Sequence, residues 1–168
     1  RVLFRSAQLN IEKMVASGTL GGYPDGTFKP DNTITRAEFA TMLVKAFNSG
    51  NIGGKTFTDT AQHWAKDYIA QATASGVVSG YDADTFGPDN LITREQMAVM
   101  ITRAAKLIGA AEEVQFADSG NISGWARDAI AAATSNGIMK GYPDNTIHPQ
   151  GSATRAEAVT VIVNALRK

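Results

Sequence analysis

One loop-and-helix pattern occurs three times in this chain, and it constrains the fold more than any other feature of the sequence. A Gly-Tyr loop is followed by a proline and then by Thr-Arg at the start of a predicted helix. The three arginines, Arg36, Arg94 and Arg155, lie 58 and 61 residues apart (94 − 36 and 155 − 94). Such a period indicates copies of one structural unit, so a site built on the unit should also recur. This multiplicity favours a multivalent binding module over an enzyme with one active centre.

The composition is that of a globular protein without a strong electrostatic preference. Of 168 residues, 43% are hydrophobic and 19% are charged, and the formal net charge is zero. Neutrality argues against nucleic acid as a partner, and no apolar run is long enough for membrane insertion. The chain has no cysteine, which excludes disulfides and thiolate metal sites. No signal peptide opens the sequence, which predicts an intracellular protein or a mature or excised piece of an exported one.

Each unit is predicted to consist of a helix, a loop and a second helix. In the second unit the first helix covers about 64–75, with Trp64, Tyr68, Ile69 and Ala72 on one face and Gly76 as its stop. The second helix of every unit carries apolar residues at i, i+3, i+4, i+7 and i+8, which is typical of an amphipathic helix. These residues are Phe39, Met42, Leu43, Ala46 and Phe47; Met97, Met100, Ile101, Ala104 and Ala105; and Ala158, Val161, Ile162, Ala165 and Leu166.

A unit of this size cannot bury its apolar face alone, so the three units are expected to share one core. We therefore predict a mainly α fold, a pseudo-threefold bundle of three helix-loop-helix repeats rather than an open solenoid. The repeats cover residues 1–50, 57–109 and 116–168 and together form one structural domain. The first repeat is divergent or truncated in its N-terminal part, because Ser6 stands where the later repeats have Trp64 and Trp125.

The threonine of each Thr-Arg pair has a structural explanation. A threonine followed three residues later by Glu or Gln, just before an apolar helix, predicts a capping box in which side chains and backbone amides bond reciprocally. The pairs that fit are Thr35 with Glu38, Thr93 with Gln96, and Thr154 with Glu157.

Capping does not explain the arginine that follows each threonine. As the first helical residue it faces the positive end of the helix dipole, which costs a few tenths of a kcal/mol, roughly. Two kinds of partner could offset this cost. One is a nearby carboxylate, for which Asp25, Asp84 and Asp144 are the candidates. The other is a bound anion, held by the guanidinium together with the free amides of the first helical turn.

Further candidate residues recur with the repeat. The tyrosines at the loop entrances are expected to be packed rings, with a stacking platform for a sugar as the alternative. The tryptophans are expected in the core or between units, with the same alternative. The glycines before the tyrosines allow a positive φ or a close approach of the backbone. These residues are Tyr23, Tyr81 and Tyr142; Trp64 and Trp125; and Gly22, Gly80 and Gly141.

No pattern of catalytic or metal-ligating residues stands out in the sequence. His63 and His148 lie in non-equivalent positions without a companion at zinc-ligand spacing. The Asp-rich loops lack the alternating oxygen ligands of an EF-hand and are predicted to be turns. No nucleophile elbow, phosphate loop or dinucleotide fingerprint occurs. We expect no enzymatic activity, no cofactor and no metal.

The motifs, taken in order, resemble those of a known family. Phe-x-Asp, Trp-Ala, Gly-Tyr-Pro-Asp-Gly-Thr-Phe, Pro and Ile-Thr-Arg-Ala-Glu look like the S-layer homology repeat, in three copies over nearly the whole chain. The resemblance implies grooves between neighbouring repeats and non-covalent anchoring of a secreted surface protein to a secondary cell-wall polysaccharide, often one carrying a pyruvate ketal. It also implies that Arg36, Arg94 and Arg155 bind the acidic group, which shifts the balance between the two partners toward a bound anion.

From this resemblance we expect a cell-surface anchor module, monomeric in isolation, whose inter-repeat grooves bind an anionic polysaccharide. The alternatives are a peptidoglycan or envelope tether and a protein-interaction module for surface-lattice assembly. The copies differ, because the second reads Thr-Arg-Glu-Gln and the third loop has Asn145 and Ile147 where Gly and Phe are typical. If each arginine meets the tryptophan of the next repeat, Arg155 would face Ser6 and have the weakest groove.

Overall fold

The computed structural model describes residues 28–47, 53–107 and 112–167. These ranges contain the helices α2 (Arg36–Phe47), α3 (Lys66–Ala74), α4 (Arg94–Ala104), α5 (Arg127–Ser135) and α6 (Arg155–Leu166), and two short 3₁₀ helices, η1 (Ser119–Asn121) and η2 (Gly124–Ala126). Strand pairing in the described ranges is limited to isolated bridges, so the predicted mainly α fold is confirmed. The candidate residues Gly22, Tyr23 and Asp25, and Ser6, lie outside the described residues.

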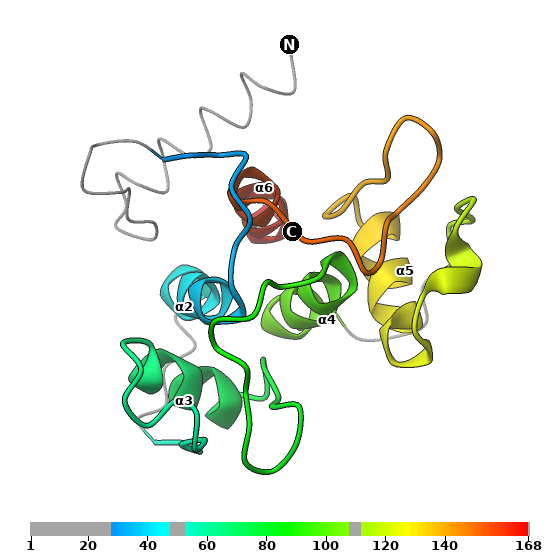
Figure 1. Cartoon of the computed structure of the whole chain (residues 1–168). Coiled ribbons are helices and arrows are strands. Elements are labelled where there is room, and N and C mark those ends of the chain that lie inside the picture. Colours follow the sequence, from blue (N-terminus) through cyan, green and yellow to red (C-terminus); the bar gives the residue numbers. More distant parts are fainter. Residues whose placement is uncertain (1–27, 48–52, 108–111, 168) are drawn as a thin grey trace.

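Helices α2, α4 and α6 meet pairwise at the centre of the molecule (Figure 1). A ring of three backbone hydrogen bonds marks the pseudo-threefold axis where the chain approaches these helices. Ile34 N donates to Ala153 O (3.1 Å), Ala153 N to Ile92 O (3.0 Å), and Ile92 N to Ile34 O (3.0 Å). Because the ring closes, the three repeats form a bundle and not an open solenoid, as predicted.

In the second and third repeats, whose two helices are both described, the two helices of one repeat do not pack on each other. Instead α3 packs on α2 and α5 packs on α4, so each of these first helices lies against the second helix of the preceding repeat (Figure 1). Among the described helices, α3 and α4 of the second repeat share no packing contact. The apolar face of a helix is therefore buried by a different repeat, which is why one copy of the sequence pattern is not an autonomous folding unit.

The predicted apolar stripes contribute to the buried core. Phe39, Leu43, Ile101 and Ile162 are completely buried. Leu166 differs, because half of it is exposed at the last position of α6, so the stripe of the third repeat ends one residue early. No described helix has both the length and the apolar character needed to cross a membrane.

The Gly-Tyr loops rest on the aromatic ring of the Phe-x-Asp motif. A Cβ atom added to Gly80 would lie 2.4 Å from the ring of Phe57, and one added to Gly141 would lie 2.5 Å from the ring of Phe116. These distances are far shorter than any van der Waals contact, so both positions require glycine for close approach. Of the two sequence-based explanations for these glycines, close approach is the correct one.

The aspartate of the same motif holds the loop through hydrogen bonds from the loop's backbone amides. The Asp59 carboxylate accepts hydrogen bonds from Phe86 N (3.0 Å) and Gly87 N (2.8 Å). In the next repeat, the Asp118 carboxylate accepts from Ile147 N (2.9 Å) and His148 N (2.9 Å). The sequence reasoning missed this supporting role, although the recurrence of Phe-x-Asp ahead of the second and third loops was the available signal.

Candidate ligand-binding grooves

The first turn of each central helix is occupied by protein hydrogen bonds. Arg36 N donates to Asn90 O (2.9 Å) and Ala37 N to Pro88 O (2.9 Å). The corresponding bonds of the other two helices run from Arg94 N to Gly151 O, Glu95 N to Pro149 O, Arg155 N to Asn32 O, and Ala156 N to Pro30 O. The prediction that free helix amides help to bind an anion is therefore wrong. The proline-containing turn of a neighbouring repeat uses those amides, and only the guanidinium groups can face a ligand.

The capping boxes are confirmed for two of the three helices. Glu38 N donates to Thr35 Oγ1 (3.1 Å) while Thr35 N donates to Glu38 Oε1 (3.2 Å), and Thr93 and Gln96 exchange the same two bonds. In α6 the forward bond from Glu157 N to Thr154 Oγ1 is present (3.1 Å), without the return bond. The carboxylate of Glu157 lies against Arg94 instead.

Each arginine clamps the loop of the next repeat. The Arg36 guanidinium donates from Nε to Phe86 O (3.0 Å) and from Nη2 to Ser79 O (3.0 Å). The corresponding donors of Arg94 reach Ile147 O (2.8 Å) and Lys140 O (2.9 Å), and Arg155 Nε reaches Phe28 O (3.0 Å). The contacts run from the first repeat to the second, the second to the third and the third to the first. The arginines are therefore part of what holds the threefold arrangement together.

Two of the three arginines also form ion pairs, with partners that the sequence reasoning did not name. Arg94 pairs with Glu157, and Arg155 Nη1 lies 2.8 Å from Glu38 Oε2. These glutamates are the last residues of the Thr-Arg-Ala-Glu motifs. The sequence reasoning explained them as helix caps and therefore did not consider them as ion-pair partners of an arginine. The position that corresponds to them beside Arg36 is Gln96. Within the described ranges Arg36 has no ion pair.

Two of the aspartates proposed as arginine partners, Asp84 and Asp144, have a different role, so that expectation is wrong for them. The Asp144 carboxylate accepts from the backbone N of Thr146 (3.1 Å), which is two residues further along its own loop. Asp84 is held through its backbone oxygen, which accepts from Thr58 N (2.8 Å). The neighbouring Asp82 carboxylate accepts from Asp84 N (2.8 Å). The bonds that the Asp82 and Asp144 carboxylates accept within their own loops are typical of Asx turns, as predicted for the loops.

Aromatic rings cover the arginines. The Arg36 Cζ atom lies 4.4 Å from the ring centroid of Tyr81 and 4.6 Å from that of Phe86. Among the described rings, that of Tyr142 lies 4.6 Å from Arg94 and that of Phe28 lies 4.6 Å from Arg155. These are cation–π distances. Tyr81 is nevertheless 52% exposed, so its ring packs on the arginine and still presents area to solvent. The ring is therefore packed, as expected, and its exposed area is also available as a stacking platform for a sugar, which was the alternative.

A groove of about 400 Å³ lies beside Arg36, between the second repeat and the third. The side chains that matter for recognition are Arg36, Tyr81, Gln96, Arg103 and Trp125. A second groove of about 350 Å³ lies beside Arg94, and it is lined among others by Lys140, Tyr142, Glu157 and Arg167. Both volumes are within the range of small-molecule sites and would accommodate a sugar residue.

The tryptophans lie on the surface, so the expectation of core or inter-unit packing is wrong. Trp64 is 63% exposed and Trp125 is 61% exposed. Arg36 does meet the loop of the second repeat, but the tryptophan in its groove is Trp125 from the third. The expected pairing of Arg36 with Trp64 is therefore wrong. The cause is the packing of α5 on α4, which carries the segment before α5 one repeat further around the bundle.

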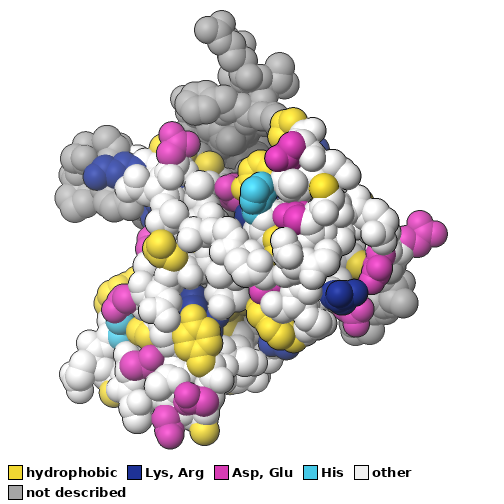
Figure 2. All heavy atoms as spheres, turned by 45° about the vertical axis from the view of Figure 1, so that its right-hand side comes forward, with side chains coloured by type: hydrophobic (Ala, Val, Ile, Leu, Met, Phe, Trp, Pro, Cys, Tyr) yellow, Lys and Arg dark blue, Asp and Glu magenta, His cyan; other side chains and the backbone are white. Residues whose placement is uncertain are grey.

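At neutral pH the groove arginines are charged and the tyrosine hydroxyl is neutral. Burial lowers the pKa of Arg36 from its ordinary value, against the opposing influence of Tyr81 and Asp59, and an arginine remains protonated at any physiological pH. Burial likewise raises the pKa of Tyr142, so its hydroxyl stays neutral. Acidic and basic side chains are interspersed on the face drawn in Figure 2, without the continuous basic area that a nucleic acid would require.

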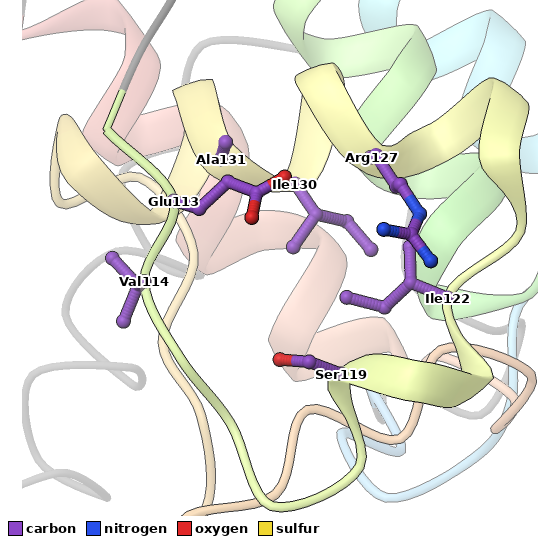
Figure 3. Close-up of a pocket in the computed structure, with 7 residues that line it drawn as sticks. All are labelled: Glu113, Val114, Ser119, Ile122, Arg127, Ile130 and Ala131. Carbon is purple, nitrogen blue, oxygen red and sulfur yellow. The ribbon is translucent and has the colours of Figure 1, made fainter.

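A third, much smaller cavity lies within the third repeat, between the segment that leads into η1 and helix α5 (Figure 3). Its volume is about 30 Å³, and Glu113, Ser119 and Ile130 are among the residues that line it. This space suffices for a water molecule or two but not for a sugar. None of the three arginines borders it, so the candidate ligand sites are the two grooves.

Comparison with known proteins connects these grooves to a family. The S-layer homology domain family matches residues 6–40, 56–98 and 115–159. The chain is 38% identical over 161 residues to a cellulosome-anchoring protein of Acetivibrio thermocellus, covering 89% of this chain and 35% of that protein. It is 31% identical over 155 residues to a surface-layer 125 kDa protein of Lysinibacillus sphaericus, covering 90% and 13%. An amylopullulanase of Thermoanaerobacterium thermosulfurigenes matches at 33% over 165 residues, covering 94% and 9%. The chain thus spans about a third or less of these relatives.

Proposed function

The chain belongs to the S-layer homology family, and from that membership we propose that it anchors a surface protein non-covalently to the cell wall. The ligand is an anionic secondary cell-wall polysaccharide, expected to carry pyruvate ketals, and it is bound in the grooves between repeats. The module acts at the cell surface and has no catalytic activity of its own. Relatives named as a cellulosome-anchoring protein and as a surface-layer protein are consistent with this role.

One observation carries the proposal: each described groove combines a buried guanidinium with a largely exposed aromatic ring. Arg36 is 3% exposed beneath Tyr81 (52% exposed), and Arg94 is 4% exposed beneath Tyr142 (38% exposed). A guanidinium donates charge-assisted hydrogen bonds to a carboxylate. An aromatic face packs against the apolar C–H face of a sugar ring. Together these groups fit a glycan that bears a carboxylate better than they fit a neutral glycan or a polypeptide strand.

The remaining candidate residues have supporting parts in this proposal. Trp125 forms a wall of the Arg36 groove. Trp64 stands before α3, which packs on α2, and by analogy with Trp125 we assign it to the corresponding wall on the side of Arg155. Gly80 and Gly141 bring the loop backbone close to the core. In the first repeat, the counterparts of these loop residues are Gly22, Tyr23 and Asp25.

Binding of a polymer at more than one groove would make the attachment strong even if each groove binds weakly. Once one sugar is held, a second sugar of the same chain is present at high local concentration near the next groove. A repeat fold with several similar grooves is well suited to this mode of attachment, since it needs no new contact to gain avidity.

The test is calorimetric titration of the protein with purified wall polysaccharide, before and after mild acid treatment that removes pyruvate ketals. We expect binding to the intact polymer and a loss of about tenfold or more after treatment, since each charge-assisted contact contributes about 1.5–3 kcal/mol. Equal binding to both preparations would contradict the role of the acid group. Binding only to peptidoglycan, or only to another protein, would favour an envelope tether or a lattice-assembly module instead.

A further inference from the structure

The guanidinium of Arg36 differs from the other two arginines in the atom that faces the groove. Its Nε and Nη2 donate to backbone oxygens of the second repeat, as in Arg94. Its Nη1 has no hydrogen-bond partner among the described residues, whereas Nη1 of Arg94 and of Arg155 are bonded to glutamates. The difference follows from the sequence, because Gln96 replaces the glutamate that pairs with the arginine in the other repeats.

Both Nη1 of Arg36 and the amide nitrogen of Gln96 are open to the groove. In the part of the chain that the structure describes, every fully buried side-chain nitrogen has a hydrogen-bond partner. An unbonded nitrogen on either residue is therefore accessible to solvent, and both residues line this groove. Gln96 Oε1 accepts from Thr93 N (3.1 Å), which leaves the NH₂ group of Gln96 as a free donor. The groove thus presents N–H donors from two side chains and no opposing carboxylate.

Total charge does not explain the difference between the two grooves. The Arg36 groove is lined by two arginines, and the Arg94 groove by two arginines, one lysine and one glutamate. Each lining therefore has a formal charge of +2. What differs is whether the buried guanidinium is already paired, because an anion that enters the Arg94 groove meets the carboxylate of Glu157 at the same nitrogen.

The second repeat has its glutamate at position 95 instead of position 96. Glu95 supports the wall of the Arg36 groove that contains Trp125. Glu95 is 3% exposed, and its carboxylate accepts from Ser123 N (3.0 Å), Ser123 Oγ (2.7 Å) and Gln150 Nε2 (3.3 Å). Ser123 is the residue that precedes η2, and Trp125 lies within η2. The corresponding positions in the other repeats are Ala37 and Ala156, which have no group that could make these bonds.

We propose that the Arg36 groove is the one specialised for a sugar carboxylate, with Arg36 and Gln96 donating to the acid and Trp125 packing against the sugar ring. Glu95 is a positioning residue that holds Trp125 in place through Ser123. The inference rests on the proposed function and adds to it which groove takes the acidic group. Arg94 and Arg155 bind the same group more weakly, because Glu157 and Glu38 already occupy their guanidinium groups.

The test uses two reciprocal substitutions and a matched pair of probes. The probes are a hexosamine glycoside carrying a pyruvate ketal and the methyl ester of that ketal, which is neutral. Gln96→Glu should weaken binding of the acidic probe about tenfold or more, because like charges then meet in the groove, while binding of the ester is unchanged. Glu157→Gln should add a second site for the acidic probe. Gln96→Glu keeps its fold because glutamate occupies the same capping position in Glu38.

Several outcomes decide the inference. Unchanged affinity of Gln96→Glu for the acidic probe would overturn it. Gln96→Ala removes the amide donor without adding a charge and should lose less affinity than Gln96→Glu, so an equal loss would overturn the role of like charge in the groove. Wild-type binding to wall polysaccharide without binding to the acidic probe would overturn it while leaving the anchoring function intact. Failure of the wild type to bind wall polysaccharide would instead refute the proposed function itself.

The role of Glu95 is tested by tryptophan fluorescence in a Trp64→Phe background, where Trp125 is the remaining tryptophan. Glu95→Ala should abolish the emission change that accompanies probe binding and weaken binding several-fold. Glu95→Gln should retain most of both, because the amide oxygen can still accept from Ser123. Ser123→Ala, which removes one of the bonds, should have an intermediate effect and serves if Glu95→Ala does not fold. Full emission change and affinity in a folded Glu95→Ala or Ser123→Ala protein would overturn the role of Glu95.

Discussion

The Arg36 groove and the Arg94 groove share a backbone arrangement and differ in the side chains placed on it. In both, the arginine donates from Nε and Nη2 to two carbonyl oxygens of the next repeat, at 2.8–3.0 Å. The third nitrogen, Nη1, is open to the groove in Arg36 and bonded to Glu157 in Arg94. One guanidinium thus has two separable tasks. Two of its nitrogens hold the repeats together, and the third is available for a ligand wherever no carboxylate occupies it.

The aromatic surroundings differ in the same direction. Arg36 lies between the rings of Tyr81 and Phe86, whereas Ile147 replaces the second ring beside Arg94. Trp125 lines the Arg36 groove, and no tryptophan lines the Arg94 groove within the described residues. Because the main-chain clamps fix the fold in both places, the groove walls can vary without loss of the bundle. Similar repeats can therefore differ in ligand affinity.

The largest expected effect is the difference in polysaccharide affinity between the Arg36→Ala and Arg94→Ala variants. Arg36→Ala should lower the affinity for the acidic polysaccharide about 100-fold, since a charge-assisted contact and a stacking surface are lost together. Arg94→Ala should lower it by less than about tenfold. Calorimetric titration of both variants measures this difference. Arg36→Lys, which keeps the charge but loses the forked geometry, should fall between them.

A control is needed because both alanine variants leave two carbonyl oxygens without a donor. Each should lose about 1–3 kcal/mol of stability from the clamp, and Arg94→Ala should lose more than Arg36→Ala, since it also removes the ion pair with Glu157. Urea denaturation shows whether the binding difference survives at equal fractions of folded protein. Arg94→Ala or Arg155→Ala as the most damaging substitution for binding would contradict the distinction between the grooves.

The second prediction compares the stability that each groove contributes. Here the larger effect is expected in the Arg94 groove, whereas the larger effect on binding is expected in the Arg36 groove. Glu157→Ala should cost about 1–2 kcal/mol, since it leaves the buried charge of Arg94 unpaired, at the lower end for buried pairs because Glu157 is partly exposed. Gln96→Ala removes only a return bond of a capping box and should cost about 0.5–1 kcal/mol. Denaturant midpoints with unchanged m-values give both numbers. Equal losses in the two variants would show that the Arg94–Glu157 pair adds no stability.

The third prediction concerns the loop beside the Arg94 groove and its dependence on pH. Burial alone would raise the pKa of Asp118, but hydrogen bonds from the backbone amides of Ile147 and His148 hold that pKa below its ordinary value. A carboxylate with a lowered folded-state pKa contributes stability above its unfolded pKa of about 3.9, and the contribution disappears as pH falls through the folded value. Asp118→Asn should therefore be less stable than wild type at neutral pH, by about 1 kcal/mol or less for an exposed site.

The matched measurement is urea denaturation of both proteins from neutral pH down to about pH 3. The difference in free energy of unfolding should shrink as the solution becomes acidic, because the wild-type carboxylate is then protonated. A difference that stays constant over this range would mean that the charge of Asp118 does not stabilise the loop.

The smallest expected effect is none at all. The carboxylates of Asp82 and Asp144 accept hydrogen bonds from amides and hydroxyls of their own loops, and these bonds lower the pKa of both groups. We expect the melting temperature to be the same in calcium and in EDTA, as measured by calorimetry. A shift of several degrees would show that one of the loops is a metal site rather than a turn.

The sequence by itself determined the features that depend on residues a few positions apart. The start of each central helix follows from a threonine and the Glu or Gln three residues later, and the buried face from the spacing of apolar residues. The number of repeats required a shared core, which predicted the pseudo-threefold bundle. For Gly80 and Gly141 the alternatives of positive φ and close approach were recognised, and the rings of Phe57 and Phe116 decided between them.

Only the tertiary structure decided which repeats supply the parts of each groove. The partners of Arg36, Arg94 and Arg155 lie 50, 63 and 117 residues away along the chain, and no local pattern encodes such distances. The packing of α5 on α4 places Trp125 beside Arg36. The proline-containing turns of neighbouring repeats use the helix amides that sequence reasoning had left free. Caps and apolar stripes are set by local geometry. The composition of a groove depends on how the three repeats pack together. The effect of Gln96 in place of glutamate can therefore be recognised only once the packing shows that this position lies beside Arg36 of another repeat.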